Sequence, residues 1–219
     1  YVVVTDNGFG SKANSPDAML MFHRLKPNWQ TGAVELLATR FLHDPDRKVP
    51  FVIVNEHSEK RYLTGGDFDL ESVQPIGNEL WFGDEFGPWL IRTDANGKVL
   101  AVHETRLDGK VLRSPDHPAM VMPGAPGAVK FEVQRSRGFE GMAASPDGKL
   151  LYPLLEGPLW SEATNGWEMK DNRQFLRILE FDVAKGEYTG RSFKYLLEAN
   201  GHAIGDFNMI DATSGLIIE

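Results

Sequence analysis

The sequence contains no cysteine, and it has fewer positive than negative side chains. Without thiols, disulfide bonds and thiolate metal sites are excluded, and the cellular compartment is left open. Lys and Arg number 23 against 31 Asp and Glu, and the resulting formal net charge of −8 argues against nucleic acid as a partner. No apolar run reaches about eighteen residues, so no membrane span is expected.

The chain has 219 residues, which is enough for one large all-β domain. Glycine and proline lie in turn clusters rather than in a linker, so a single domain over residues 1–219 is expected. The first residues, Tyr1–Asp6, read as the middle of a strand. They lack the charged start and small-residue cleavage site of a signal peptide, so none is expected there.

Three segments, 68–85, 138–156 and 204–219, repeat one pattern of a short strand, a turn containing glycine and a second apolar strand. Each is typical of a β-hairpin. The first two segments continue into further strands joined by Asn-Gly or Lys-Gly turns, and Asn-Gly between apolar runs is a strong hairpin signal. The predicted continuations are strands at 89–93 and 98–102 and, in the second unit, at 176–181 and 188–195.

Four antiparallel strands per repeated unit are typical of a propeller blade. The repeat distance is 69 positions from Glu71 to Glu140 and 66 from Glu140 to Asp206, so long loops at 43–67, 105–137 and 157–174 must separate the blades. A closed propeller needs at least about four blades, so a partial propeller is expected, as either a fragment or the ordered portion of a longer protein. The predicted divisions are a partial blade at 1–42, blades at 68–104 and 138–196, and a half blade at 204–219.

Acidic residues recur where the two strands of each predicted hairpin reach the same edge. The pairs are Glu71 with Glu85, Glu140 with Glu156, and Asp206 with Glu219, and Asp6 ends the matching strand of the first unit. The first two strands of a blade lie nearest the propeller axis, so these acids should gather at one mouth of the channel. Crowded carboxylates repel one another unless a cation lies among them.

Ca²⁺ fits best, because it accepts about six to eight oxygen ligands in flexible geometry, whereas the lack of Cys disfavours Zn²⁺. The alternative is that these acids cap strand ends in water or pair with Arg61, Arg92 and Arg137. The predicted metal ligands are Asp69, Glu71, Glu85, Glu140, Glu156, Asp206 and Glu219.

Three segments, 61–72, 80–88 and 137–149, resemble the phytase-like domain, also called the esterase-like activity of phytase family. Residues 6–10 and 14–17 are similar to an early motif of that family, and the resemblance covers roughly residues 1–219. It implies a secreted or periplasmic bacterial β-propeller that hydrolyses phosphate or carboxylic esters. Calcium at an acidic channel mouth is what the resemblance to β-propeller phytases implies.

A catalytic version of this site would use a small-molecule ester substrate and a cation-activated water. Glu140 and Glu71 are the candidates to hold the cation or accept a proton, and His202 is a candidate base. Arg137 and Arg61 flank the acidic motifs and are candidates to bind substrate oxygens in a fork. Two alternatives remain open, a lactonase of the gluconolactonase type and a non-enzymatic propeller that binds a ligand or partner.

Overall fold

The computed structural model describes residues 1–6, 11–121 and 123–219, so residues 7–10 of the early motif lie outside the described part. The chain is all-β, with strands that pair antiparallel along their lengths. Within the described ranges, the only helix is a 3-10 turn at Lys12–Asn14. No described helix could cross a lipid bilayer.

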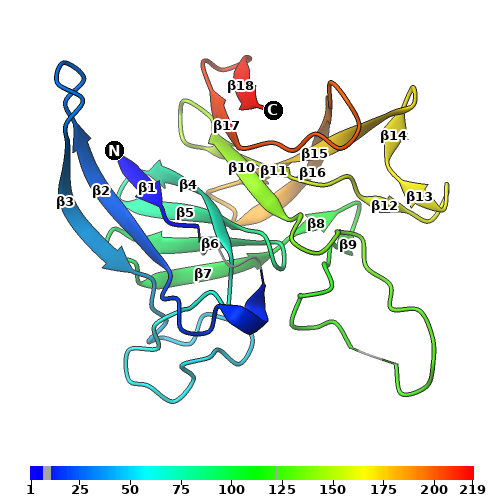
Figure 1. The fold of residues 1–219 in the computed structure, drawn as a ribbon, viewed down its shortest axis with the longest axis horizontal. Coiled ribbons are helices and arrows are strands. Elements are labelled where there is room, and N and C mark those ends of the chain that lie inside the picture. Colours follow the sequence, from blue (N-terminus) through cyan, green and yellow to red (C-terminus); the bar gives the residue numbers. More distant parts are fainter. Residues whose placement is uncertain (7–10, 122) are drawn as a thin grey trace. The chain divides into compact units, whose positions relative to one another are not determined.

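Two sheets are formed by the first half of the chain (Figure 1). In both sheets, each strand pairs with the next along the sequence, which is the arrangement of a meander. The strands of the first are β1 (Val2–Val4), β2 (Met21–Pro27) and β3 (Val34–Phe41), and those of the second are β4 (Leu70–Ile76), β5 (Glu79–Asp84), β6 (Trp89–Asp94) and β7 (Val99–Glu104).

The second half of the chain repeats this arrangement. Its main sheet runs in the order β10-β11-β15, with β16 and the short β14 both paired to β15, and β17 pairs with β18 in a separate hairpin. The bounds are β10 (Phe139–Ala144), β11 (Leu150–Leu155), β14 (Met169–Lys170), β15 (Arg173–Asp182), β16 (Glu187–Leu196), β17 (Asp206–Met209) and β18 (Gly215–Ile218).

Two of the predicted loops contain short hairpins of their own. Segment 105–137 holds β8 (Arg106–Leu107) and β9 (Lys110–Val111), and segment 157–174 holds β12 (Trp160–Ser161) and β13 (Gly166–Trp167) as well as β14. The predicted Asn96-Gly97 turn is confirmed, with Gly97 at φ 90° and the Asp94 N–H donating to the Lys98 carbonyl at 2.9 Å. The positive φ explains why glycine stands there.

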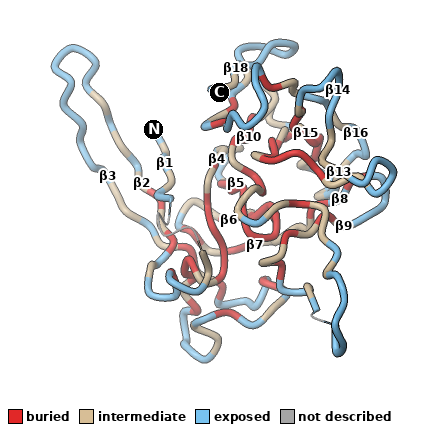
Figure 2. Tube along the Cα trace, turned by 45° about the vertical axis from the view of Figure 1, so that its right-hand side comes forward, coloured by how far each residue is buried: buried red, intermediate tan, exposed pale blue. Residues whose placement is uncertain are grey.

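The chain divides into two compact units, and each contains buried apolar side chains. Unit 1 comprises Tyr1–Phe82 and Ile91–Val102, and its buried aromatic rings include Phe22 and Phe82, whose centroids are 5.8 Å apart. Unit 2 comprises Gly83–Leu90 and His103–Glu219. The buried segments are shown in red in Figure 2. One core cluster of unit 2 consists of Ala143, Leu154, Leu176, Leu197, Ile204 and Phe207.

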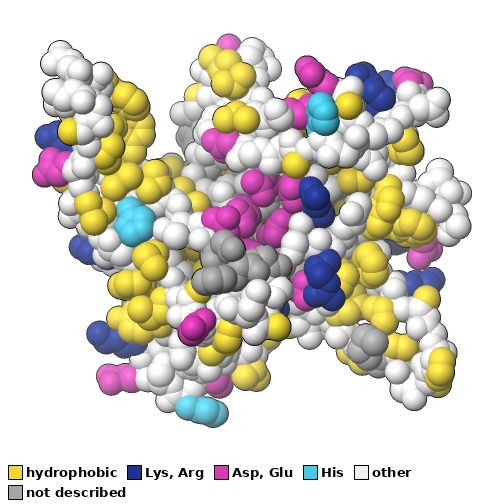
Figure 3. Space-filling view, in the orientation of Figure 1, with side chains coloured by type: hydrophobic (Ala, Val, Ile, Leu, Met, Phe, Trp, Pro, Cys, Tyr) yellow, Lys and Arg dark blue, Asp and Glu magenta, His cyan; other side chains and the backbone are white. Residues whose placement is uncertain are grey.

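The hairpin β2–β3 presents apolar side chains to solvent. Val34 and Leu36 are each 60 % exposed, and Trp29 at the turn is 78 % exposed. Figure 3 shows yellow side chains along this hairpin. In most antiparallel strands, apolar side chains are buried on one face and polar side chains lie on the other. In β3, apolar side chains are exposed instead.

Candidate metal-binding carboxylate clusters

The structure brings three acids of unit 1 together, and we call Asp6, Asp69 and Glu71 the Asp69 cluster. One carboxylate oxygen of each lies within 4.8 Å of the others. Asp6 follows β1, whereas Asp69 and Glu71 flank Leu70 at the start of β4, a strand that lies next to β1. Side chains two positions apart share one face of a strand, so Asp69 and Glu71 point to the same side while Leu70 is buried.

The turn before Asp69 is organised by Asp67. Its carboxylate accepts backbone hydrogen bonds from Thr64 N–H at 2.8 Å and from Val54 N–H at 2.7 Å. Burial raises the pKa of the Asp67 carboxyl, and these hydrogen bonds oppose the rise. The Thr-Gly-Gly-Asp segment of the family-like motif therefore has a structural role, which is to fix the loop that delivers Asp69.

Three acids of unit 2 form the Glu140 cluster, which consists of Glu85, Glu140 and Glu156. One carboxylate oxygen of each again lies within 4.8 Å of the others. Glu85 directly follows β5, Glu156 directly follows β11, and Glu140 is the second residue of β10. Only 7 % of the surface of Glu85 is exposed, and the other two are half-buried.

A β-bulge sets the position of Glu140. Phe139 pairs with Leu155 and Gly141 pairs with Leu154, so Glu140 is the additional residue between two adjacent positions of the partner strand. A bulge bends its strand and redirects the side chain of the additional residue, and bulges are frequent beside functional sites.

Arg137 brings a positive charge to the Glu140 cluster. Its Nη1 lies 2.5 Å from Oε1 of Glu156, and the Arg137 side chain is 42 % exposed. Burial raises the pKa of the Glu156 carboxyl, while the Arg137 charge and a hydrogen bond with Glu85 oppose that rise. Arg137 thus binds one of three carboxyl groups that lie close together, and close carboxyl groups favour either a retained proton or a bound cation.

Two of the predicted ligands, Asp206 and Glu219, belong to neither cluster. The carboxylate of Asp206 accepts from the N–H of Phe207 at 2.7 Å and from the side-chain amide of Asn208 at 2.8 Å. Both donors belong to β17, so the Asp206 carboxylate bonds to residues of its own strand.

Glu219 and the candidate base His202 form a network of their own. Glu219 Oε1 lies 2.7 Å from His202 Nδ1 and accepts from the N–H of Glu198 at 2.8 Å, while Oε2 accepts from Tyr195 Oη at 2.7 Å. These partners lower the pKa of Glu219 although burial opposes them. The geometry thus gives His202 a partner other than the clustered acids.

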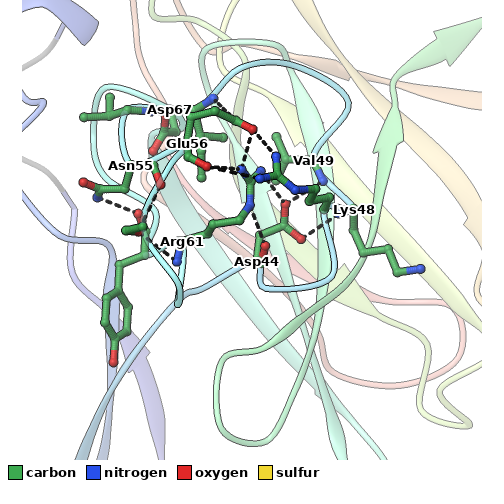
Figure 4. Close-up of polar contacts among 12 residues, drawn as sticks. Asp44, Lys48, Val49, Asn55, Glu56, Arg61 and Asp67 are labelled. Atoms are coloured by element: carbon green, nitrogen blue, oxygen red, sulfur yellow. Dashed lines mark hydrogen bonds and ion pairs between the residues drawn. The ribbon is translucent and has the colours of Figure 1, made fainter.

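The structure places Arg61 in a buried ion-pair network rather than at an acidic cluster (Figure 4). Only 3 % of its side chain is exposed, and its Nη1 lies 2.7 Å from Oε1 of Glu56. Its Nη2 lies 3.2 Å from Asp44 Oδ2, and Nε donates to the Asp44 carbonyl at 2.8 Å. A guanidinium so enclosed holds the 43–67 loop together, and the predicted contact of Arg61 with a substrate stays a prediction.

Fold and site together define an all-β protein whose units each carry a cluster of carboxylates. The chain belongs to the phytase-like family described as esterase-like activity of phytase, whose model matches residues 1–219. It is also similar to an uncharacterized secreted protein from Arthroderma benhamiae (strain ATCC MYA-4681 / CBS 112371), with 31 % identity over 120 residues. The matched stretch covers 50 % of this chain and 23 % of that relative.

Proposed function

We propose that this chain is part of a metal-dependent, extracytoplasmic hydrolase of phosphate or carboxylic esters, built as a β-propeller. Membership of the phytase-like family supports ester hydrolysis, and the secreted relative supports a place outside the cytoplasm. The repeated meanders β4–β7 and β10-β11-β15-β16 support four-stranded blades. The observation that carries the proposal is the Glu140 cluster with Arg137 beside it.

The donor set of each cluster fits Ca²⁺. All six side chains offer carboxylate oxygens, which are the ligands that hard cations prefer, and they come from separate segments that can adjust to a flexible coordination sphere. At the Glu140 cluster, a divalent cation would reduce the repulsion between three carboxylates whose oxygens lie within 4.8 Å of one another. When bound, such a cation would neutralise charge developing on an ester and make a water molecule more acidic.

Separate roles are proposed for the side chains of the two clusters and for Arg137. Arg137 holds Glu156 in place, and its 42 % exposure leaves the guanidinium accessible to an oxygen of the substrate. Glu140, on its bulge, is proposed to accept the proton of the attacking water. Glu71 in the Asp69 cluster is proposed to hold a second cation. His202 is left out of this scheme because its ring nitrogen is bonded to Glu219.

The test compares Glu140→Gln, Glu71→Gln and the double variant with the parent. Calcium binding is measured by calorimetry, and hydrolysis is measured on an aryl phosphate, an aryl carboxylate and a lactone. We expect Glu140→Gln to lower hydrolysis by about 10²-fold or more, because it removes both a ligand and the proton acceptor. Glu35→Gln and Glu187→Gln, at exposed positions of units 1 and 2, are the matched controls.

Each outcome separates the candidates. Faster turnover of the lactone than of the other two esters would favour a lactonase of the gluconolactonase type. Calcium binding without turnover of any substrate would favour a non-enzymatic propeller. A double variant that hydrolyses the esters at the parental rate would disprove the proposed site.

A further inference from the structure

Unit 2 contains a groove of about 830 Å³ that is distinct from the carboxylate clusters, and we call it the tryptophan groove. It lies among the β8–β9 hairpin, segment 128–132 and the β12–β13 hairpin. Its volume is within the range of sites for small molecules. The apolar side chains that line it include Leu107, Leu112, Phe131, Leu159, Trp160 and Trp167.

The two tryptophans form a fixed corner of the groove. Trp160 and Trp167 are paired across β12–β13, and their rings lie 5.1 Å apart at an interplanar angle of 81°. The backbone N–H of Trp160 donates to the backbone carbonyl of Glu132 at 2.9 Å, which ties the β12–β13 hairpin to segment 128–132. Both residues are half-buried, so each indole is held by the protein while part of it remains accessible.

A polar pair lines the same groove. Arg177 Nε lies 2.8 Å and Nη2 lies 2.5 Å from the two oxygens of Glu168, and both side chains are 16 % exposed. A further bond of 2.9 Å joins Arg177 Nη1 to Ser192 Oγ. The forked geometry holds both groups in one orientation, so they offer hydrogen-bonding positions that are already ordered.

The charges around the groove nearly balance. The lining holds four acids, Asp108, Glu132, Glu162 and Glu168, and three cations, Lys110, Lys130 and Arg177. Two of these groups, Lys130 and Glu162, lie 3.5 Å apart and are largely exposed. A groove with this balance has no strong preference for an anion or a cation, in contrast to the Glu140 cluster.

We propose that the tryptophan groove binds a neutral saccharide. Sugar rings combine apolar C–H faces with hydroxyl groups. The C–H groups are polarised by the neighbouring oxygens, so they are attracted to the negative face of an indole. The hydroxyl groups can donate to carboxylates and accept from guanidinium groups such as the Glu168–Arg177 pair. This proposal does not depend on the proposed function, because no residue of either carboxylate cluster lines the groove.

The experiment titrates the full chain with neutral hexasaccharides of glucose and of N-acetylglucosamine, by calorimetry and by tryptophan fluorescence. We expect Trp160→Ala and Trp167→Ala to weaken binding by about 10-fold or more, because truncated tryptophans are among the residues whose loss costs binding most. Trp167→Phe keeps an aromatic ring in the hairpin and should cause a smaller loss. Trp29→Ala, at a site that is 78 % exposed in unit 1, is the matched control and should bind like the parent. Circular dichroism confirms that each variant is folded.

Three results would overturn the proposal. The first is that no hexasaccharide binds at concentrations up to about 10 mM, a range that covers weak sites. The second is that a saccharide binds but both alanine variants retain parental affinity. The third is that the groove takes up an uncharged apolar dye, with loss in Trp160→Ala, while it binds no saccharide. Loss of ester hydrolysis in the Glu140 variants leaves this measurement unaffected.

Discussion

Gly138 lies directly against the backbone of Glu85. A Cβ atom on Gly138 would be 2.2 Å from the Glu85 carbonyl oxygen and 2.7 Å from its Cα. The carbonyl of Gly138 also accepts from the N–H of Glu156 at 2.8 Å. The glycine is thus the point at which the backbones of Glu85 and Glu156 come together, and it brings their carboxyl groups to the same place.

Gly138→Ala should therefore displace Glu85, because a methyl group cannot fit against backbone atoms that have no rotamer to change. We expect a loss of stability of about 2 kcal/mol or more together with weaker calcium binding. Urea unfolding and calorimetry measure the two effects. Gly205→Ala is the control, because the nearest atom to its Cβ would be a methyl carbon of Ile218 at 4.0 Å. Equal effects of the two substitutions would show that the close approach is not important.

Arg61→Lys should destabilise the 43–67 loop. A lysine ammonium cannot replace the fork that binds Asp44 and Glu56, and the buried Asp44 would lose its ionic partner. We expect a loss of about 3 kcal/mol, measured by urea unfolding. Arg92→Lys is the comparison, because Arg92 and Glu79 form a similar but more exposed pair, with 37 % and 30 % exposure. Its loss should stay below about 1 kcal/mol, and a larger loss than at Arg61 would contradict this assignment.

The same loop should lose stability in acid. Hydrogen bonds from Arg61 and from the Ile53 N–H lower the pKa of Glu56 to about 2. Its stabilising effect is thus complete above the ordinary glutamate pKa of about 4.3 and disappears as the pH falls toward about 2. Hydrogen exchange of residues 43–67 between these pH values would detect the opening. Glu56→Gln should remove this pH dependence, and an unchanged profile would exclude Glu56 as its source.

Calcium should raise the melting temperature if the clusters bind it. A ligand that binds only the folded state stabilises by about 2.7 kcal/mol at a concentration of about 100 times its Kd. Differential scanning calorimetry with increasing free Ca²⁺, and after chelation, measures this effect. Glu140→Gln should reduce the shift, whereas Glu187→Gln should preserve it. A melting curve that does not respond to Ca²⁺ would argue against both cation sites.

The hairpins can be predicted from the sequence because each depends on residues that are close together in the chain. Asn96-Gly97 and Lys185-Gly186 require a turn, and alternating apolar residues on either side require strands. The same local rule explains why Glu140 and Glu156 were expected to lie close together, since they stand at one edge of one hairpin.

Contacts between hairpins are less predictable. The approach of Gly138 to Glu85 depends on backbone packing that no periodic pattern encodes. Asp206 carries the same kind of side chain as Glu140 and begins a similar hairpin, but it binds the amides of its own strand. Arg61 flanks an acidic motif in the sequence, but it donates to the buried Asp44, 17 positions away, and to Glu56. The tryptophan groove was missed because short strands such as β12 and β13 give almost no pattern.

The bulge at Glu140 makes the direction of that carboxylate depend on the number of residues in β10 rather than on the chemistry of its neighbours. Deletion of one residue between Phe139 and Gly141 would restore an unbroken ladder with β11 and leave every other pairing intact. A family member with such a deletion would keep the strand and its fold while it lost the acid from the cluster. The number of residues in β10 therefore distinguishes two groups of relatives. Those with the additional residue keep the acid in the cluster, and those without it keep only the fold.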